Sequence, residues 1–480
     1  MKRIALPLAI TFLCISLVQA EVKLPAIFGN NMVLQQKNAN LIWGTADPGE
    51  DVSVSIAGQT KTAKADADGK WSVKLDPLEV GEPLAMTIKG KNELTFENVL
   101  VGEVWIGSGQ SNMQWSLNNS TEPWNTIREA DFPNIRLITV PTVSKTTPQD
   151  NFTGQWAPCT PQNVPGFSAV LFYFGRKLHQ ELDVPVGLIH CSWGGSSCES
   201  WINYDVVAAN PDFANIIQRR INREVEQPQG GDNQQVGYLY NGMLHPILGY
   251  GIRGVIWYQG ETNAGRAYQY RTLFPTMIDH WRDEWKQRSG QETLPFYWVQ
   301  LANFRQTQDN PADSAWAELR EAQNMTRSLP NSGQAVIIDI GVADDIHPRN
   351  KRDVGLRLAL LALNNDYGKT QPSESPQFNS VAFNGNEAVL KFDFVYDGLV
   401  SQGATPTGFS VAGEDKVFHW ATAAIVDKDT VVVSSPQVAH PVAVRYGWAD
   451  NPVVTMYNSA RLPLSPFRTD DWQGVTADNR

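Results

Sequence analysis

A serine, a histidine and a cluster of aspartates occupy positions where a hydrolase would hold a nucleophile and its base. Ser111 lies in the segment Gly107–Met113 (GSGQSNM), directly after the apolar run Val99–Ile106. The run predicts a buried strand, and a tight turn after it would present the Ser111 hydroxyl at the carboxyl end of the strand, where open α/β sheets bind ligands. Such a serine, taken alone, is more often a turn residue or a helix N-cap.

A matching base follows another apolar run. The segment DIGVADDIHPRN contains Asp344 and His347 at spacing i, i+3, which allows a loop carboxylate to fold back onto the imidazole. A serine nucleophile needs such a base, and the base needs an acid that orients it. We therefore expect a triad of Ser111, Asp344 and His347, with Asp345 and Asp339 as alternative acids. HExxH, GxGxxG and P-loop patterns are not found, so no metal and no cofactor is expected.

Two further loops offer donors for an oxyanion. Gln259 follows the apolar run Gly254–Tyr258 in WYQGETNA, and its amide could donate to a developing negative charge. The loop CSWGGSSCESW contains Gly194 and Gly195, one of which would supply a backbone N–H. We expect the oxyanion to be held by the N–H of Ser111, by one of these glycines and by Gln259.

Residues that could contact a sugar are polar or aromatic. The candidates for substrate binding are Trp193, Asn241, Glu261 and Arg266, and three more tryptophans near the loops could stack on a sugar ring: Trp115, Trp124 and Trp201. Arg266 could pair with the carboxylate of an acidic sugar, whereas a neutral acetylated xylan would not need it.

Strand and helix patterns alternate in the middle of the chain. Buried strands are predicted at Val99–Ile106, Val186–Cys191, Gly254–Tyr258, Phe296–Leu301 and Ala335–Ile340, with helical periodicity from Val170, from Tyr270 and from Val354. This alternation predicts an α/β unit over residues 99–370 with a mainly parallel sheet. Short alternating strands predict a β-domain at 21–98 and a second one at 371–480, after the stretch Gln371–Gln377.

The composition of the chain predicts its location and argues against some classes of partner. Residues 1–20 have a basic start, a short apolar middle and small residues at the end, which predicts a signal peptide and a secreted or periplasmic protein. Its removal would take the net charge from −11 to −13, which argues against nucleic acid and anionic membranes as partners. Export would permit a disulfide, for which Cys191 and Cys198 are the preferred pair and free thiols the alternative. The oligomeric state is left open.

The motifs in this order resemble the sialate O-acetylesterase family of SGNH hydrolases. The shared segments span nearly all of the chain after residue 20: LPAIFGNNMVLQQ, GQSNM, SWGG, LYNGM, WYQGETN, VQLANF, DDIHP, NKRDVGLRLAL and RLPLSPFRTD. The resemblance implies a flavodoxin-like three-layer core and ester hydrolysis on O-acetylated sugars, with Ser111 as nucleophile, His347 as base and Asp344 as acid. It also implies that Gln259 takes the place of an asparagine found in many SGNH enzymes.

The expected activity is removal of acetyl groups from a sialic acid-type sugar through an acyl-enzyme. An acetylxylan or hemicellulose acetylesterase with the same mechanism is the first alternative. A non-catalytic carbohydrate-binding protein is the second, and the presence of a nucleophile, a base and an acid argues against it because binding alone needs none of them.

Overall fold

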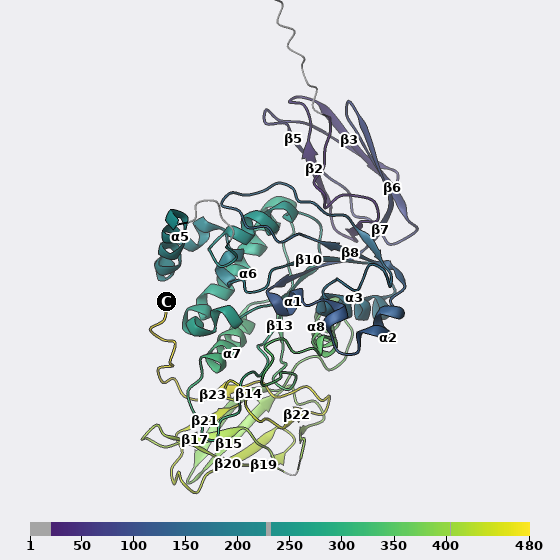
Figure 1. Ribbon diagram of the computed structural model, residues 1–480. Coiled ribbons are helices and arrows are strands. Elements are labelled where there is room, and N and C mark those ends of the chain that lie inside the picture. The colour runs from purple at the N-terminus through teal and green to yellow at the C-terminus, as the bar shows by residue number, and fades with distance from the viewer. Residues whose placement is uncertain (1–20, 227–231, 404) are drawn as a thin grey trace, which may run out of the picture.

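The computed structural model describes residues 21–226, 232–403 and 405–480. The predicted signal peptide, residues 1–20, lies outside the described residues. The described chain is elongated, with a β-rich region at the amino-terminal end, an α/β unit in the middle and a second β-rich region beyond it (Figure 1).

The α/β unit is built on a parallel sheet whose central strand is β7 (Glu93–Gly109). The strands run in the order β13-β12-β11-β7-β10-β8-β9. Their bounds are β8 Phe132–Thr139, β9 Ala157–Cys159, β10 Val186–Ser192, β11 Gly254–Tyr258, β12 Phe296–Val299 and β13 Ser332–Ala335, and only β9 is antiparallel to its neighbour on this path. The predicted α/β class with a parallel sheet is confirmed.

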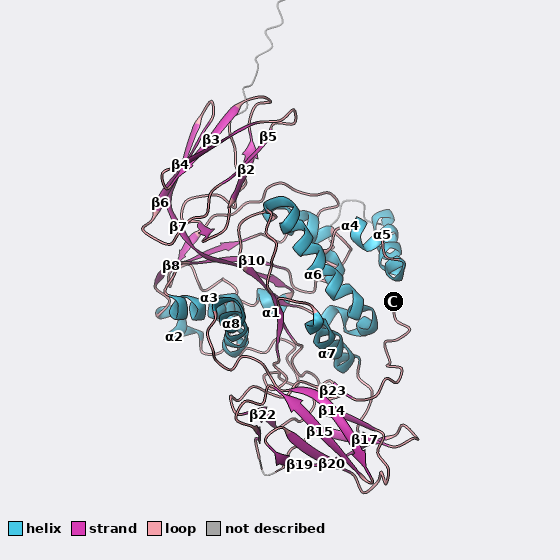
Figure 2. Cartoon of the chain, turned by 180° about the vertical axis from the view of Figure 1, so that it is seen from behind, coloured by secondary structure: helices cyan, strands magenta, loops and turns pink. Residues whose placement is uncertain are grey.

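Helices cover both faces of this sheet. On one side α3 (Ala169–Leu182) packs against α8 (Lys351–Tyr367), and on the other α6 (Ala267–Ser289) packs against α7 (Ala315–Met325) (Figure 2). Local signals set their ends, since the Ser168 side chain caps α3 and Gly368 ends α8 in the left-handed region. The other α-helices are α1 (Ser111–Gln114), α2 (Pro123–Arg128), α4 (Tyr204–Ala208) and α5 (Ala214–Glu226).

One predicted strand is misplaced. The apolar run Ala335–Ile340 predicts a strand, but β13 ends at Ala335 and the run continues as a turn. Val336, Ile337 and Ile338 are nevertheless buried. Apolar composition reports burial, and Ile337 is buried in the same core as α8 and the sheet without strand pairing.

The amino-terminal β-region and the α/β unit share a strand. The region contains β1 Val33–Gln35, β2 Leu41–Thr45, β3 Asp51–Ile56, β4 Gln59–Lys64, β5 Lys70–Lys74 and β6 Leu84–Lys89. The first part of β7 pairs with β6, and its last part pairs with β10 and β11. The boundary expected between residues 98 and 99 therefore falls inside a continuous strand.

The carboxyl-terminal region consists of short antiparallel strands with their own apolar core. They are β14 Gln377–Asn384, β15 Glu387–Asp393, β16 Leu399–Ser401, β17 Phe409–Ala412, β18 Phe418–Trp420, β19 Thr422–Asp427, β20 Thr430–Ser434, β21 Ala443–Tyr446, β22 Met456–Asn458 and β23 Phe467–Arg468. Arg320 of α7 anchors this region, because its buried guanidinium donates to the carbonyl oxygens of Ala449 and Asp450.

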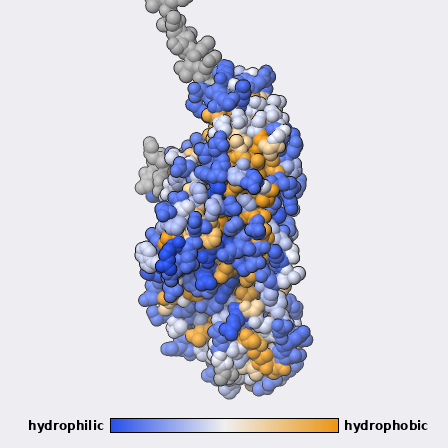
Figure 3. All heavy atoms as spheres, turned by 90° about the vertical axis from the view of Figure 1, so that its right-hand side faces the viewer, coloured by the Kyte–Doolittle hydropathy of each residue, from blue (hydrophilic) through white to orange (hydrophobic). Residues whose placement is uncertain are grey.

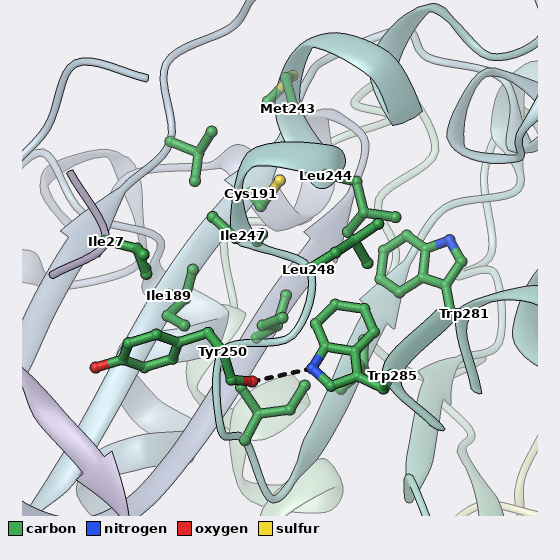
Figure 4. Packing of buried hydrophobic residues seen from close by; sticks show 14 of the residues in the cluster. Ile27, Ile189, Cys191, Met243, Leu244, Ile247, Leu248, Tyr250, Trp281 and Trp285 are labelled. Atoms are coloured by element: carbon green, nitrogen blue, oxygen red, sulfur yellow. Dashed lines mark hydrogen bonds between the residues drawn. The ribbon is translucent and has the colours of Figure 1, made fainter. Parts of the chain in front are cut away.

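The expected disulfide is absent, and all three described cysteines are free and buried. Cys191 lies on β10 among apolar side chains such as Leu244 and Ile247 (Figure 4). Cys198 instead lies 3.7 Å from the sulfur of Met277 on α6. Burial raises the pKa of both thiols, so they stay protonated and behave as small apolar groups. Closeness in sequence is a poor guide here because strand β10 and the turn after it direct the two side chains to different neighbours.

The surface is mainly hydrophilic on the face shown in Figure 3, with apolar residues in scattered patches. Among the described residues, no helix combines the length and apolar composition that crossing a membrane requires.

Candidate active site

Ser111 lies at the carboxyl end of the central strand. β7 ends at Gly109, and α1 begins at Ser111. The strands β8 to β10 lie on one side of β7, and the later strands β11 to β13 lie on the other. This is the switch point at which open parallel sheets bind their ligands. Gly109 has φ +130°, and a Cβ there would lie 2.2 Å from the carbonyl oxygen of Tyr258. Only glycine allows the strand to turn so close to β11.

The structure brings His347 to Ser111. Nε2 of the imidazole is 2.8 Å from the Ser111 hydroxyl oxygen, although the two residues are 236 positions apart in the sequence. The imidazole stacks on the Trp115 ring with 4.9 Å between ring centroids and 17° between planes. The predicted nucleophile and base thus form a hydrogen-bonded pair, and Trp115 fixes the plane of the base.

The aspartates near His347 differ in what they contact. Asp345 accepts a 2.8 Å hydrogen bond from the His347 backbone N–H, and its carboxylate is 3.8 Å from Nδ1 of the ring. Asp344 is exposed, and no contact between it and the imidazole is found in the described part of the chain. Asp339 pairs through both oxygens with Arg357 and is removed as a candidate acid. The structure therefore places Asp345, one of the expected alternatives, nearer to the base than Asp344.

The surroundings of His347 favour its neutral form. Burial lowers the pKa of the imidazole, the positive charge of Lys351 lowers it further, and Asp345 acts in the opposite direction. A general base must be unprotonated before it can accept the serine proton. The net effect keeps His347 competent to accept the Ser111 proton at lower pH than an ordinary histidine.

Of the two candidate glycines, Gly194 is the one beside the nucleophile. A Cβ on Gly194 would lie 3.2 Å from that of Ser111, whereas a Cβ on Gly195 would have only Asn233 within 4 Å, at 3.8 Å. The Gly194 N–H donates to the side-chain oxygen of Gln114 at 2.8 Å. Gln114 must move aside before this N–H can hold an oxyanion.

Gln259 is hydrogen-bonded within the protein at both ends of its amide, which differs from the prediction. Its side chain is fully buried, and its amide nitrogen donates to the Ser196 carbonyl at 3.2 Å and to Asn263 at 2.7 Å. Its amide oxygen accepts from the Tyr270 hydroxyl at 3.0 Å. With both ends of the amide committed, Gln259 joins the loop after β11 to the loop after β10, and the predicted role as oxyanion donor is not met in this structure.

Arg266 is also engaged within the protein. It lies 2.8 Å from Glu199, a carboxylate whose side chain is 2 % exposed. Arg219 and Asn263 contact the same carboxylate, and these partners lower the pKa of Glu199 against the opposing effect of burial. The expectation that Arg266 is available for a substrate carboxylate is wrong, because removing it would leave Glu199 buried with less compensation.

The remaining candidates for substrate binding differ in how exposed they are. Asn241 is buried and donates to the Lys145 carbonyl, and Trp201 is fully buried in the core. Trp193 is half-buried. Trp124 is 77 % exposed. The tryptophan next to the reacting atoms is Trp115, through its stacking on His347.

The sequence matches a known protein family and individual members of it. Residues 101–363 match the family model described as carbohydrate esterase, sialic acid-specific acetylesterase. A sialate O-acetylesterase from Pongo abelii is 30 % identical, with 91 % of this chain and 90 % of the relative covered. The chain belongs to this family. The human sialate O-acetylesterase is 29 % identical over the same shares of the two chains.

A solved structure supports the family at the level of the whole fold. A carbohydrate acetylesterase from Xanthomonas citri superposes with a TM-score of 0.85 at 42 % identity, covering 94 % of this chain and 100 % of that one. Membership in the acetylesterase family makes the protein an esterase hydrolase that acts on acetylated carbohydrate, as the motifs predicted.

Two residues of the acetylesterase site escaped the sequence reasoning. Lys351, the first residue of α8, is 0 % exposed, and it contacts the Oδ1 atom of Asn112, the neighbour of Ser111. Asn112 also donates to Glu261 at 2.5 Å. The signal was available, since Asn112 lies within GQSNM and Lys351 within NKRDVGLRLAL, but a lysine in the first turn of a helix is usually solvated.

Proposed function

We propose that the protein hydrolyses O-acetyl esters of sialic acid-type sugars through an acyl-enzyme formed on Ser111. The supporting observation is the 2.8 Å hydrogen bond between the Ser111 hydroxyl and Nε2 of His347 at the switch point of the parallel sheet. A protein that only binds sugars would have no use for this arrangement.

In the proposed reaction His347 takes the proton from Ser111 as the hydroxyl oxygen attacks the acetyl carbonyl. The tetrahedral oxyanion is held by the Ser111 N–H, at the start of α1, and by the Gly194 N–H after Gln114 has moved. His347 then protonates the departing sugar oxygen, and water activated by the same base releases acetate and restores the hydroxyl. A carboxylate from the pair Asp344 and Asp345 stabilises the imidazolium between these steps.

The orienting acid can be assigned by two matched variants. The family motif implies Asp344, and the position of the ring favours Asp345, which is 3.8 Å from Nδ1. Asp344→Asn and Asp345→Asn change one atom each on neighbouring residues. We expect one variant to lose most of kcat while the other keeps it, and loss in neither would remove the acid from the mechanism.

The acidic sugar is favoured by a cation at the site. Arg349 lies just after the base, 3.9 Å from Asp345, and its side chain is 68 % exposed. A cavity of about 520 Å³ opens beside it, lined by Thr121, Ile340, Val342, Asp344, Asp345, Arg349 and Asn350. Arg349 can pair with a sialic acid carboxylate, which a neutral acetylated xylan lacks.

Acetate release tests the substrate. Wild type, Ser111→Ala and Arg349→Met are compared on O-acetylated sialic acid and on acetylated xylan oligosaccharides. We expect only wild type to release acetate from the sialic acid at full rate, and a raised KM for that substrate in Arg349→Met. Release from xylan alone, unaffected by Arg349→Met, would make the protein a hemicellulose acetylesterase instead.

We further propose that the chain is exported and loses Met1–Ala20. The supporting observation is the order of basic, apolar and small residues in that segment. Sequencing the amino terminus of the protein recovered outside the cytoplasm should give Glu21 as the first residue, and an intact Met1 would refute export by cleavage.

A further inference from the structure

Lys351 occupies an unusual position for a positively charged side chain. It is fully buried at the first position of α8, where the helix dipole already favours anions. Burial lowers the pKa of its ammonium to about 7, and the nearby carboxylates of Glu261 and Asp345 oppose that change. A lysine kept at such a site in spite of two unfavourable effects needs a compensating arrangement around it.

The compensation is centred on Asn112. Its Oδ1 atom accepts from the Lys351 ammonium, and its Nδ2 atom donates to Glu261 at 2.5 Å and to the carbonyl of Ile346 at 3.1 Å. An amide offers one acceptor and two donors, which matches these three partners. The rings of Trp115 and Tyr258 face the ammonium at 5.9 and 5.3 Å, within reach of a cation–π attraction.

These hydrogen bonds join the loops that form the site. Asn112 follows the nucleophile after β7, Glu261 follows β11, and Ile346 directly precedes the base His347. The amide of Asn112 therefore bridges the nucleophile loop to the base loop one residue away from each reacting side chain. Without the Lys351 ammonium as donor to its oxygen, the amide could turn over, and the bond to Ile346 would no longer be enforced.

We propose that Lys351 is a positioning residue: by fixing the amide of Asn112 it holds the loop of His347 at reacting distance from Ser111. The inference rests on the proposed function of Ser111 and His347. Glu261, a predicted substrate-binding residue, instead accepts a hydrogen bond from Asn112 near the Lys351 ammonium. Burial raises the pKa of its carboxyl against the opposing effects of Asn112 and Lys351, and its second oxygen is buried with no hydrogen-bond partner in the described structure.

Four charged groups around the base enter this inference. Asp345 lies on the base's own loop and raises the pKa of His347, Lys351 approaches from α8 and lowers it, and Glu261 approaches from the loop after β11 and acts on Lys351. Arg349 faces Asp345 from the solvent side at 3.9 Å. Below pH 7 Lys351 is mainly protonated, so its charge is present in the range where an imidazole titrates.

The test compares Lys351→Met with Arg352→Met. Methionine keeps the length of the buried side chain without its charge, and Arg352 is the exposed cation at the next position of the same helix turn. We expect Lys351→Met to lower kcat by about tenfold to a hundredfold, with KM little changed, because misplaced reacting groups cost about that much. The pKa of His347, followed by NMR with His347→Gln to assign its signal, should rise. Arg352→Met should change neither quantity.

A wild-type kcat in Lys351→Met, or a lowered kcat with an unmoved His347 pKa, would overturn the proposal and leave Lys351 with a packing role. Should Lys351→Met fail to fold, the double variant Lys351→Met/Glu261→Gln removes both buried charges and should fold with the same rise in pKa. The NMR titration needs no turnover. Inactivity of wild type on every acetyl ester would thus refute the proposed function and leave this inference separately measurable.

Discussion

Two fully buried cations on opposite faces of the central sheet have different surroundings. Arg320 of α7 donates to backbone carbonyls on every side of its guanidinium, at 2.7 to 2.9 Å, from Leu301, Ala302, Ala449 and Asp450. Every one of these acceptors is backbone, and together they join the α/β unit to the carboxyl-terminal strands. Arg320 is a structural cation.

The ammonium of Lys351 on α8 has one hydrogen-bond partner in the described structure, and that partner is a side chain at the active site. Its pKa is lowered to about 7, against a cation that usually stays protonated well above that. The contrast teaches that burial alone does not reveal the role of a charge. A fully satisfied charge stabilises the fold, whereas a partly satisfied one next to reacting groups is available to act on them.

The largest expected effect is on stability, from Arg320→Met. Four carbonyl oxygens would lose their donor, and the free energy of unfolding should fall by about 3–5 kcal/mol, as for a broken buried charge network. Urea unfolding measures this loss. The control is Arg305→Met, which removes an arginine that pairs with Asp450 and is 63 % exposed, and it should cost about 1 kcal/mol or less. Equal losses in both variants would contradict the structural role of Arg320.

The two glycines after β10, Gly194 and Gly195, also differ in role: one is expected to affect activity and the other stability. A methyl group on Gly194 would meet the Gln114 oxygen and the Ser111 Cβ, each at 3.2 Å, so Gly194→Ala should lower kcat by about a hundredfold through the oxyanion contact. Gly195 has φ +74°, so Gly195→Ala should instead cost stability, about 1–2 kcal/mol, with kcat preserved. Initial rates and melting curves of both variants separate the effects. A lower kcat in Gly195→Ala alone would reverse the assignment.

The pH profile measures the combined effect of burial, Lys351 and Asp345 on the pKa of His347. His347 must be neutral to act as base, so activity is present above its pKa and falls as the pH drops through it. Because burial and Lys351 lower that pKa, the acidic limb of kcat/KM should lie below about 6.5, the ordinary value for histidine. The measurement is log kcat/KM against pH on a fixed acetyl ester. A limb above that value would mean that Asp345 outweighs the other two influences.

The smallest expected effect concerns the buried thiols. Since Cys159, Cys191 and Cys198 are free, dithiothreitol should leave the melting temperature unchanged. A native disulfide would be detected at once, because its loss typically removes about 2–5 kcal/mol. Counting thiols with Ellman's reagent in denatured, unreduced protein that lacks residues 1–20 should find all three, and a count of one would restore the pair Cys191 and Cys198.

Motifs and periodicity predicted the parts of the site that depend on strand ends. Ser111 and His347 follow buried segments, and a parallel sheet brings such ends to one edge, so their meeting could be expected from the sequence. The helices from Val170 and Val354 were equally visible, because their apolar faces recur at helical spacing. The strand at Ala335–Ile340 was misplaced because burial and strand pairing give the same apolar signal.

The side-chain partners could not be predicted from sequence. Gln259 has the amide to bind an oxyanion, and Arg266 has the charge to pair with a carboxylate. In the structure, however, Gln259 is hydrogen-bonded to Asn263 and Arg266 is paired with Glu199. Such pairings depend on where three loops meet, which no spacing within one loop reveals. Lys351 was missed for the same reason, since its burial is a property of the assembled site.

The most direct test of the account is to label the nucleophile. An organophosphorus ester reacts with a serine that a neighbouring histidine activates, and peptide mass spectrometry locates the product. We predict one label per chain, on Ser111, with acetylesterase activity falling in proportion to labelling and with much slower labelling in His347→Gln. A label on another residue, or full activity in the fully labelled protein, would contradict the assignment of Ser111 and His347 as the reacting pair.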